Sequence, residues 1–212
     1  MTIVAPIAPG TVDPDVIEAA VYVLRQGGLV AYPTDTVYGL ACSAFVVDSL
    51  ARLYDVTSRP FSEPLPVQIG HARDIGTLAR EVPRRAQPLI DAYFPGPLTL
   101  VFHRMPTVSL TLTGGRNTVG VRMADHPLVL SIIRAFETPV VCPPACLFGR
   151  PLPISAADVL EDLDGKIDLL IDGGTLSGRT PSTVVDVTQP LARIMREGRI
   201  TRAEIAELID IA

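Results

Sequence analysis

The chain alternates amphipathic stretches at helical spacing with short, continuous apolar runs. The first amphipathic stretch begins at Asp13 and Pro14, because aspartate caps free backbone N–H groups and proline fits the first helical position. Its apolar residues recur every three or four positions until the glycine pair at 27–28, which ends the helix. The apolar run that follows, residues 29–32, has the length of a buried strand.

The same alternation continues to the end of the chain. It predicts further helices at 47–56, 83–93, 127–136, 155–163 and 202–211, and strands at 65–69, 98–103, 118–123, 139–142, 168–171, 183–187 and 192–196. Interleaved helices and strands indicate an α/β fold. The strands at 98–103 and 118–123 have no full helix between them, so we expect a mixed sheet with flanking helices.

Length and composition indicate one globular unit. The 212 residues are 48% hydrophobic, which is enough for a substantial core and excludes a disordered chain. No linker, repeat or low-complexity segment divides the sequence, so we expect a single domain over residues 1–212. The sequence has neither an apolar run of about 20 residues nor a signal-like N-terminus. We therefore expect a cytoplasmic protein without a membrane partner.

Cysteine spacing and net charge limit the kinds of metal-binding and nucleic-acid-binding site that we expect in this protein. The three cysteines, Cys42, Cys142 and Cys146, form no paired C-x-x-C motif, which favours neither a disulfide framework nor a zinc site. The net charge of −5 argues against nucleic-acid binding over the whole surface, because that affinity comes mainly from lysine and arginine. Arginines cluster at 80–85 and 193–202, so a local basic groove for RNA stays open.

Four segments have a residue order more particular than the fold requires. Residues 27–40 run from a strand into a loop rich in hydroxyl groups, at a strand end where α/β folds bind ligands. The second and third segments are Arg-Pro-Phe-Ser-Glu-Pro-Leu-Pro-Val at 59–67 and Phe-Pro-Gly-Pro-Leu-Thr-Leu at 94–100. The fourth is Thr-Val-Gly-Val-Arg-Met-Ala-Asp-His-Pro at 118–127. Two shorter motifs follow later in the chain, Gly-Gly at 173–174 and Pro-Ser-Thr-Val-Val-Asp at 181–186.

In order and spacing these segments resemble the YrdC family of threonylcarbamoyl-adenylate synthases, from near residue 11 to about residue 200. The resemblance implies an α/β fold with a twisted, open sheet and a large, concave, positively charged cleft. It also implies a reaction in which ATP, L-threonine and bicarbonate give threonylcarbamoyl-AMP and pyrophosphate, for the modification of tRNA. Mg²⁺ and basic residues would stabilise the charge that moves onto pyrophosphate.

Carried over position by position, the resemblance assigns two groups of ligand-binding residues. Thr34, Arg122 and Ser182 would hold L-threonine, with the Arg122 guanidinium on the substrate carboxylate. Arg59 and Arg196 would lie at the nucleotide. The resemblance gives no catalytic residue and no protein ligand for a metal.

Several positions depart from the family pattern. Thr57 and Cys146 stand at two nucleotide-side positions where the family usually has lysine and asparagine, and Pro144 replaces a serine. Gln68 stands where family members commonly have histidine. The nucleotide-site motif is therefore degenerate, and the loss of one stabilising contact of this kind costs about 3 to 4 kcal/mol. Arg150 is a cation that could compensate for the missing lysine.

Three functions fit this pattern. The first is a working or impaired threonylcarbamoyl-AMP synthase. The second is a non-catalytic paralogue that binds nucleotide or double-stranded RNA in the same cleft. The third is a related carbamoyl transfer to another substrate, for which Phe148 and the neighbouring prolines would shape a more apolar pocket. The sequence does not predict the oligomeric state.

Overall fold

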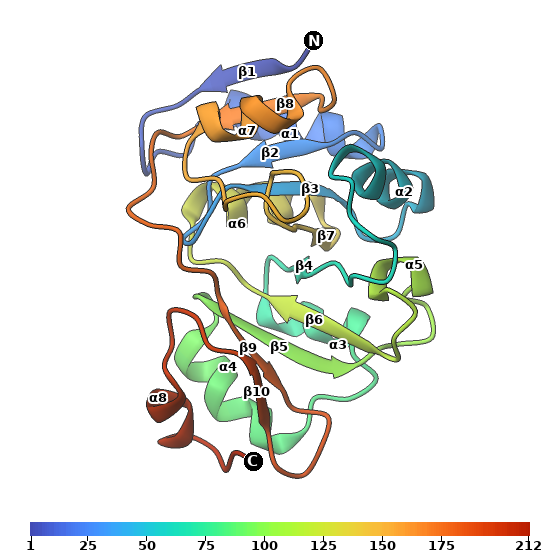
Figure 1. The fold of residues 1–212 in the computed structure, drawn as a ribbon, viewed down its shortest axis with the longest axis vertical. Coiled ribbons are helices and arrows are strands. Elements are labelled where there is room, and N and C mark those ends of the chain that lie inside the picture. The colour runs from blue at the N-terminus through green and yellow to red at the C-terminus, as the bar shows by residue number, and fades with distance from the viewer.

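A ten-stranded mixed sheet forms the centre of the molecule, with strand order β1-β8-β2-β3-β7-β4-β6-β5-β9-β10 (Figure 1). The computed structural model describes residues 1–212. The strands are β1 (Ile3–Pro6), β2 (Val30–Tyr32), β3 (Gly39–Ser43), β4 (Val67–Gln68), β5 (Leu98–His103), β6 (Thr118–Arg122), β7 (Val140–Val141), β8 (Leu169–Asp172), β9 (Thr183–Asp186) and β10 (Arg193–Arg196). The sheet contains both parallel and antiparallel pairs, which confirms the predicted α/β class with a mixed sheet.

Helices cover both faces of the half of the sheet that contains β8, β2 and β3. Helices α1 (Pro14–Arg25) and α6 (Pro127–Phe136) share one apolar cluster with alternate residues of these strands. Helices α2 (Val47–Val56) and α7 (Ala156–Leu163) contribute to a second, larger cluster with the intervening strand residues. This alternation is expected for strands that are buried on both faces.

Short helical elements accompany the other half of the sheet. They are η1 (Ala72–Asp74), α3 (Ile75–Leu78), η2 (Arg84–Ala86), α4 (Gln87–Tyr93), α5 (Leu110–Thr113) and α8 (Arg202–Ala206). Figure 1 shows α4 and α8 beside β5, β9 and β10, near the C-terminus. None of the helices is both long enough and apolar enough to cross a membrane.

Local capping explains why the long helices begin where the sequence predicts. The Asp13 side chain accepts a hydrogen bond from the Asp15 backbone N–H at 2.9 Å, and Pro14 occupies the first helical turn of α1. At α7, Ser155 and Asp158 form a reciprocal capping box. Each cap satisfies backbone donors that a helix start leaves free.

The predicted element boundaries are wrong in several short segments. Strands β1 and β3 were not predicted, and the predicted strand at 65–69 contracts to Val67–Gln68. The predicted helix at 83–93 is instead a 3₁₀ turn, η2, followed by α4. Pro88 lies in the first turn of α4, because proline fits the start of a helix but interrupts a helix that runs through it. The final helix ends at Ala206 rather than 211, and Ile211 instead bridges to Ala192 beside β10.

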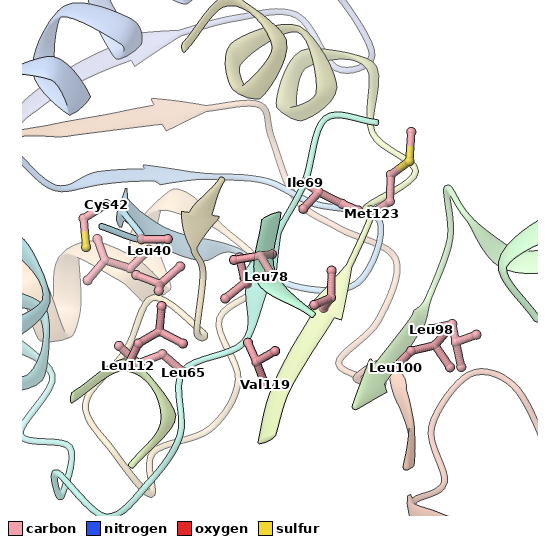
Figure 2. Packing of buried hydrophobic residues seen from close by; sticks show 14 of the residues in the cluster. Leu40, Cys42, Leu65, Ile69, Leu78, Leu98, Leu100, Leu112, Val119 and Met123 are labelled. Carbon is pink, nitrogen blue, oxygen red and sulfur yellow. The ribbon is translucent and has the colours of Figure 1, made fainter. Parts of the chain in front are cut away.

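The pleat of the sheet separates a buried face from a face that is open to ligand. Val67, Val121, Leu100 and Val185 are in register across β4, β6, β5 and β9, and all four belong to the larger core cluster. Figure 2 shows part of this packing, including Leu100 and Val119. Because side chains alternate along a strand, the next residue of each strand points the other way.

Candidate functional site

The face of the sheet opposite this core forms the floor of a cavity of about 530 Å³. Gln68, Arg122, Thr99 and Val184 lie in register across β4, β6, β5 and β9, and all four line the cavity. Three of these four side chains are polar, whereas the register next to them, formed by Val67, Val121, Leu100 and Val185, is wholly apolar. The cavity floor is therefore built by strand alternation, and its polar row marks the candidate site.

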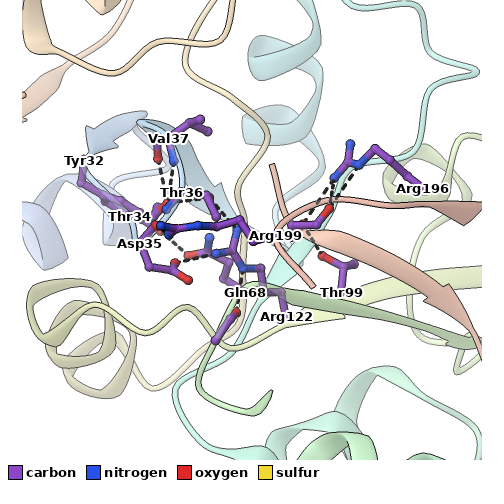
Figure 3. Close-up of polar contacts among 12 residues, drawn as sticks. Tyr32, Thr34, Asp35, Thr36, Val37, Gln68, Thr99, Arg122, Arg196 and Arg199 are labelled. Carbon is purple, nitrogen blue, oxygen red and sulfur yellow. Dashed lines mark hydrogen bonds and ion pairs between the residues drawn. The ribbon is translucent and has the colours of Figure 1, made fainter. Parts of the chain in front are cut away.

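Arg122 is the centre of a buried hydrogen-bond network (Figure 3). Its guanidinium donates through Nε to the Gly96 carbonyl at 3.1 Å and through Nη1 to the Thr36 hydroxyl at 3.0 Å. Nη2 donates to Asp35 Oδ1 at 2.5 Å, in an ion pair whose side chains are 8% and 11% exposed. Three of the five N–H donors of the guanidinium are thus engaged within the protein, and Arg122 also lines the cavity.

Thr34 shapes the loop that carries Asp35 and Thr36. The Thr34 hydroxyl donates to the Val37 carbonyl at 2.7 Å and accepts from the backbone N–H groups of Thr36 and Val37. Such side-chain-to-backbone bonds fix a tight turn. Thr34 lines the cavity, and its hydroxyl also lies 3.1 Å from the Thr36 hydroxyl.

Ser182 and Arg196 form a second polar pair in the cavity wall. The Ser182 hydroxyl lies 3.0 Å from the Thr99 hydroxyl, and Arg196 donates to the Ser182 carbonyl at 2.9 and 3.2 Å. Burial, together with the positive charge of Arg122, lowers the pKa of Arg196. Two guanidinium groups therefore act on the same part of the cavity.

Arg59 faces the cavity without an ion-pair partner. Its Nε is buried and has no hydrogen-bond acceptor, and its guanidinium carbon lies 5.0 Å from the centroid of the Phe148 ring. That distance allows a cation–π contact. Burial lowers the pKa of Arg59, and the nearby negative charge of Glu63 opposes this effect only in part. Phe148 lies in the cavity wall and leaves the cavity open.

Cysteine and proline line the side of the cavity where the family pattern breaks. Pro144 and Cys146 both line it, and neither side chain can replace a serine hydroxyl or an asparagine amide as a strong hydrogen-bonding group. Burial raises the pKa of the Cys146 thiol to about 11. A thiol with this pKa is neutral near pH 7, so Cys146 is a poor nucleophile.

Thr57 is the one predicted ligand-binding residue that the structure does not bring to the cavity. It caps the end of α2 and is fully buried, and its hydroxyl donates to the Leu53 carbonyl at 2.6 Å. The hydroxyl is therefore engaged by the helix end. The other six, Thr34, Arg59, Arg122, Cys146, Ser182 and Arg196, line one cavity.

Basic side chains outnumber acidic ones in the lining of the cavity. Its lining includes Glu63 as the single acidic residue and five arginines, at positions 59, 116, 122, 150 and 196. Arg150 is paired with Glu161 and Asp162, so its charge is largely compensated. No three His, Cys, Asp or Glu side chains lie close enough together to hold a metal ion. An anionic ligand in the cavity would meet these guanidinium groups.

Sequence reasoning missed three functional residues. Asp35 pairs with Arg122, Thr99 contacts Ser182, and Glu63 lines the cavity. Thr99 lies inside the quoted motif at 94–100 and is a polar residue within the apolar run at 98–102, which indicates a strand with one face on a polar site. Asp35 and Glu63 lie inside the quoted motifs, but their roles depend on contacts between distant segments.

Comparison with known proteins identifies relatives over most of the chain. The Sua5/YciO/YrdC family model, described as "Telomere recombination", matches residues 22–198. The threonylcarbamoyl-AMP synthase of Pyrococcus abyssi is 39% identical over 193 residues, which cover 91% of this chain and 57% of that protein. This chain therefore spans less than two thirds of that relative's length.

Solved structures agree with the sequence comparison. The structure of P. abyssi Sua5 complexed with L-threonine matches with a TM-score of 0.94 at 36% identity, over 100% of this chain and 63% of that one. The structure of Escherichia coli YciO matches with a TM-score of 0.87 at 26% identity, over 97% of this chain and 100% of that one. On its sequence and its architecture, the chain belongs to the Sua5/YciO/YrdC family.

Proposed function

We propose that this protein binds L-threonine and ATP in the cavity and acts as a threonylcarbamoyl-AMP synthase. The observation that supports this most directly is the convergence of Thr34, Arg122 and Ser182, three positions far apart in sequence, on one cavity of about 530 Å³. A cavity of this size accommodates small-molecule ligands. The P. abyssi relative, which is 39% identical to this chain, is named a threonylcarbamoyl-AMP synthase.

The chemistry requires positioning more than covalent catalysis. The amine of L-threonine forms a carbamate with carbon dioxide or bicarbonate, and a carbamate oxygen then attacks the α-phosphorus of ATP and displaces pyrophosphate. Arg122 and the hydroxyls of Thr36 and Ser182 would orient the amino acid, and Arg59 would hold the phosphates. No side chain is required to form a covalent intermediate.

Mg²⁺ would be held mainly by the phosphate oxygens of ATP. The cavity offers one carboxylate, Glu63, and magnesium commonly binds one or two carboxylates together with substrate phosphates and water. The single carboxylate in the lining of the cavity fits this way of binding magnesium. When bound, the ion would neutralise charge on the departing pyrophosphate.

A ligand-binding protein without turnover is the second candidate. It is favoured by one observation: the position where the family usually has lysine holds Thr57, whose side chain is buried in the end of α2. Arg59 is then the only unpaired, half-buried cation near that position. Loss of one such contact slows phosphoryl-type transfer by about two to three powers of ten. Such a protein would also be the candidate for binding RNA in the cleft.

Pyrophosphate release that depends on ATP, L-threonine and bicarbonate is the decisive assay. The synthase predicts release only when all three are present with Mg²⁺, and threonylcarbamoyl-AMP as the product in mass spectrometry. Ligand binding by calorimetry without turnover would support the second candidate. We propose the cytoplasm as the location, since ATP, threonine and tRNA are all present there.

A further inference from the structure

The Arg59 guanidinium reaches the cavity with few contacts to orient it. Its Nε is buried without a hydrogen-bond acceptor, and the residue lines the cavity. The specific contact that the structure gives the guanidinium is the ring of Phe148, whose centroid lies 5.0 Å from the guanidinium carbon. A long, flexible side chain loses conformational entropy when a ligand fixes it. A contact that orients the guanidinium before the ligand arrives therefore favours binding.

The end of α2 determines where the chain carries Arg59 to the cavity. The Ser58 N–H donates to the Asp55 carbonyl and the Arg59 N–H donates to the Tyr54 carbonyl, both at 3.0 Å. Ser58 lies in the left-handed region with a φ of 50°, the conformation that commonly ends a helix with this pair of bonds. The backbone of Arg59 is thus fixed relative to the helix, and the remaining freedom lies in its side chain.

The same helix end also holds Phe148. The Phe148 N–H donates to the Thr57 carbonyl at 2.8 Å, and the neighbouring Leu147 N–H donates to Asp162 Oδ2 of α7 at 3.1 Å. The backbone that carries the ring is therefore tied to two helices. Thr57 does not itself line the cavity, but its carbonyl anchors the ring beside Arg59, two residues further along the chain.

Phe148 is only partly buried, and its ring faces a cation. It lies in the cavity wall, where an aromatic side chain gains only part of the free energy that full burial provides. A guanidinium over the face of an aromatic ring keeps its N–H donors at its edges. Those edges are the part of arginine that binds phosphate oxygens, so the ring contact leaves Arg59 able to bind an anion.

We propose that Phe148 is a positioning residue, whose ring holds the Arg59 guanidinium toward the phosphate oxygens of the nucleotide. This inference rests on the proposed binding of ATP. Phe148 contacts no reacting atom, and its effect reaches the ligand through Arg59. The ring supplies orientation, whereas the positive charge that a lysine would add at the position of Thr57 stays absent.

The test is calorimetric titration of inorganic pyrophosphate into the wild type, Phe148→Leu and Phe148→Tyr. Leucine keeps an apolar side chain but has no aromatic face, so we expect the affinity to fall by about threefold to tenfold. Tyrosine keeps the ring, so its affinity should stay within about twofold of the wild type. Phe148 is partly exposed, so both variants should fold, which circular dichroism checks.

A double-mutant cycle shows whether the ring acts through Arg59. The Arg59→Gln background has no guanidinium, so Phe148→Leu should change the pyrophosphate affinity of that background by less than about twofold. A general effect of the ring on the shape of the cavity would give the same loss in both backgrounds. Where Arg59→Gln binds pyrophosphate too weakly to titrate, the difference between Phe148→Leu and Phe148→Tyr decides.

Two controls separate this role from general damage to the cavity. Phe45→Leu is the matched substitution, because Phe45 is 43% exposed, close to the 46% of Phe148, and lies outside the cavity. It should bind pyrophosphate as the wild type does. L-Threonine should bind to the Phe148 variants with unchanged affinity, since its proposed ligands do not include Arg59.

The outcomes distinguish the role of Phe148 from the proposed function. If the wild type binds pyrophosphate and Phe148→Leu binds it equally well, the role of Phe148 alone is overturned. The same holds if Phe148→Tyr loses as much affinity as Phe148→Leu, or if threonine binding falls in parallel. A folded wild type that binds neither pyrophosphate nor ATP with Mg²⁺ overturns the proposed function, and the inference with it. A loss that tyrosine prevents and that the Arg59→Gln background abolishes supports the inference.

Discussion

Arg59 is a half-buried cation that the Phe148 ring and the nearby charge of Glu63 compensate only in part. Its side chain makes no ion pair, and its buried Nε lacks an acceptor, whereas Arg122 and Arg150 are both paired with carboxylates. A cation left in this state costs stability unless a ligand pairs with it. Arg59 is therefore the residue on which we expect a phosphate ligand to depend most.

Replacement of Arg59 by glutamine should weaken the binding of inorganic pyrophosphate by about tenfold or more, because a charge-assisted hydrogen bond contributes about 1.5–3 kcal/mol. The free protein should lose little stability, since the removed charge is poorly compensated. Calorimetric titration measures the first effect and thermal unfolding the second. Arg73→Gln, at an exposed position outside the cavity, is the control. Equal affinities of Arg59→Gln and the wild type would contradict the assignment.

Gly39 is required because the Cys142 thiol lies against it. A Cβ added at Gly39 would lie 2.2 Å from Cys142 Sγ, far inside contact distance, while its other neighbours would be at 3.7 Å. Gly39→Ala should therefore destabilise the protein by about 1–3 kcal/mol through overpacking. Cys142→Ala removes the colliding atom, so the double variant should recover most of that loss. Denaturant unfolding of the four proteins in this cycle measures the coupling, and simple additivity of the two losses would argue against the collision.

Individual residues were predictable only where a motif fixed the direction of their side chains. Thr34, Arg59, Arg122 and Ser182 all line the cavity, and each lies inside a quoted motif. Thr34 follows β2, Arg122 ends β6 and Ser182 immediately precedes β9. Arg59 lies in the loop after α2. Thr57 is different, since the end of α2 turns its side chain back onto the Leu53 carbonyl. A sequence motif gives the residue type at such a position but not the rotation of the helix end.

At the scale of elements, Asp168 joins three segments that are distant in sequence. Its Oδ2 accepts from the Leu29 N–H at 2.7 Å and from Arg52 of α2 at 2.6 Å, just before β8 begins. Burial raises the pKa of Asp168, but the hydrogen bonds from Arg52 and Leu29 outweigh that effect and hold the pKa below its ordinary value. The carboxylate form is thus favoured by the fold.

A lowered pKa in the folded state fixes the sign of the pH dependence. The stability from Asp168 should be present above its unfolded pKa, near about 3.9, and should be lost as the pH falls through the lower folded value. Because both partners are more than a third exposed, Asp168→Asn should cost only about 1 kcal/mol at neutral pH. Urea unfolding at about pH 7 and about pH 3 measures this, with Asp164→Asn as the control. A loss that is equal at both pH values would rule out the ionic contribution.

Long elements with clear end signals were predictable, and short ones were not. The helices at 47–56 and 127–136 match their predicted bounds, since an amphipathic period over ten residues has few alternative interpretations. Strand β3 follows a polar turn without a break in the sequence pattern, and β4 has only two residues. Such short strands are defined by their neighbours in the sheet rather than by their own sequence.

At the scale of the whole molecule, the net charge is negative, whereas the charged side chains that line the cavity are mostly positive. The chain has a net charge of −5, yet five arginines and a single glutamate line the cavity. A concave region of one sign with low-dielectric walls concentrates the electrostatic field. The surplus of negative charge lies outside the cavity, where it opposes the approach of polyanions such as RNA but is screened over about 10 Å at 0.1 M salt.

This separation predicts a salt dependence that differs between the two kinds of ligand. Raising NaCl from about 50 to about 500 mM should weaken the binding of inorganic pyrophosphate by about tenfold, because the ligand carries several negative charges into a positive field. L-Threonine is a zwitterion without net charge, so long-range attraction and repulsion cancel and its affinity should change much less. Calorimetric titrations of both ligands at the two salt concentrations test this directly. An equal loss for both would indicate a general effect of salt on the fold, and no loss for pyrophosphate would mean that the paired carboxylates already neutralise the cavity.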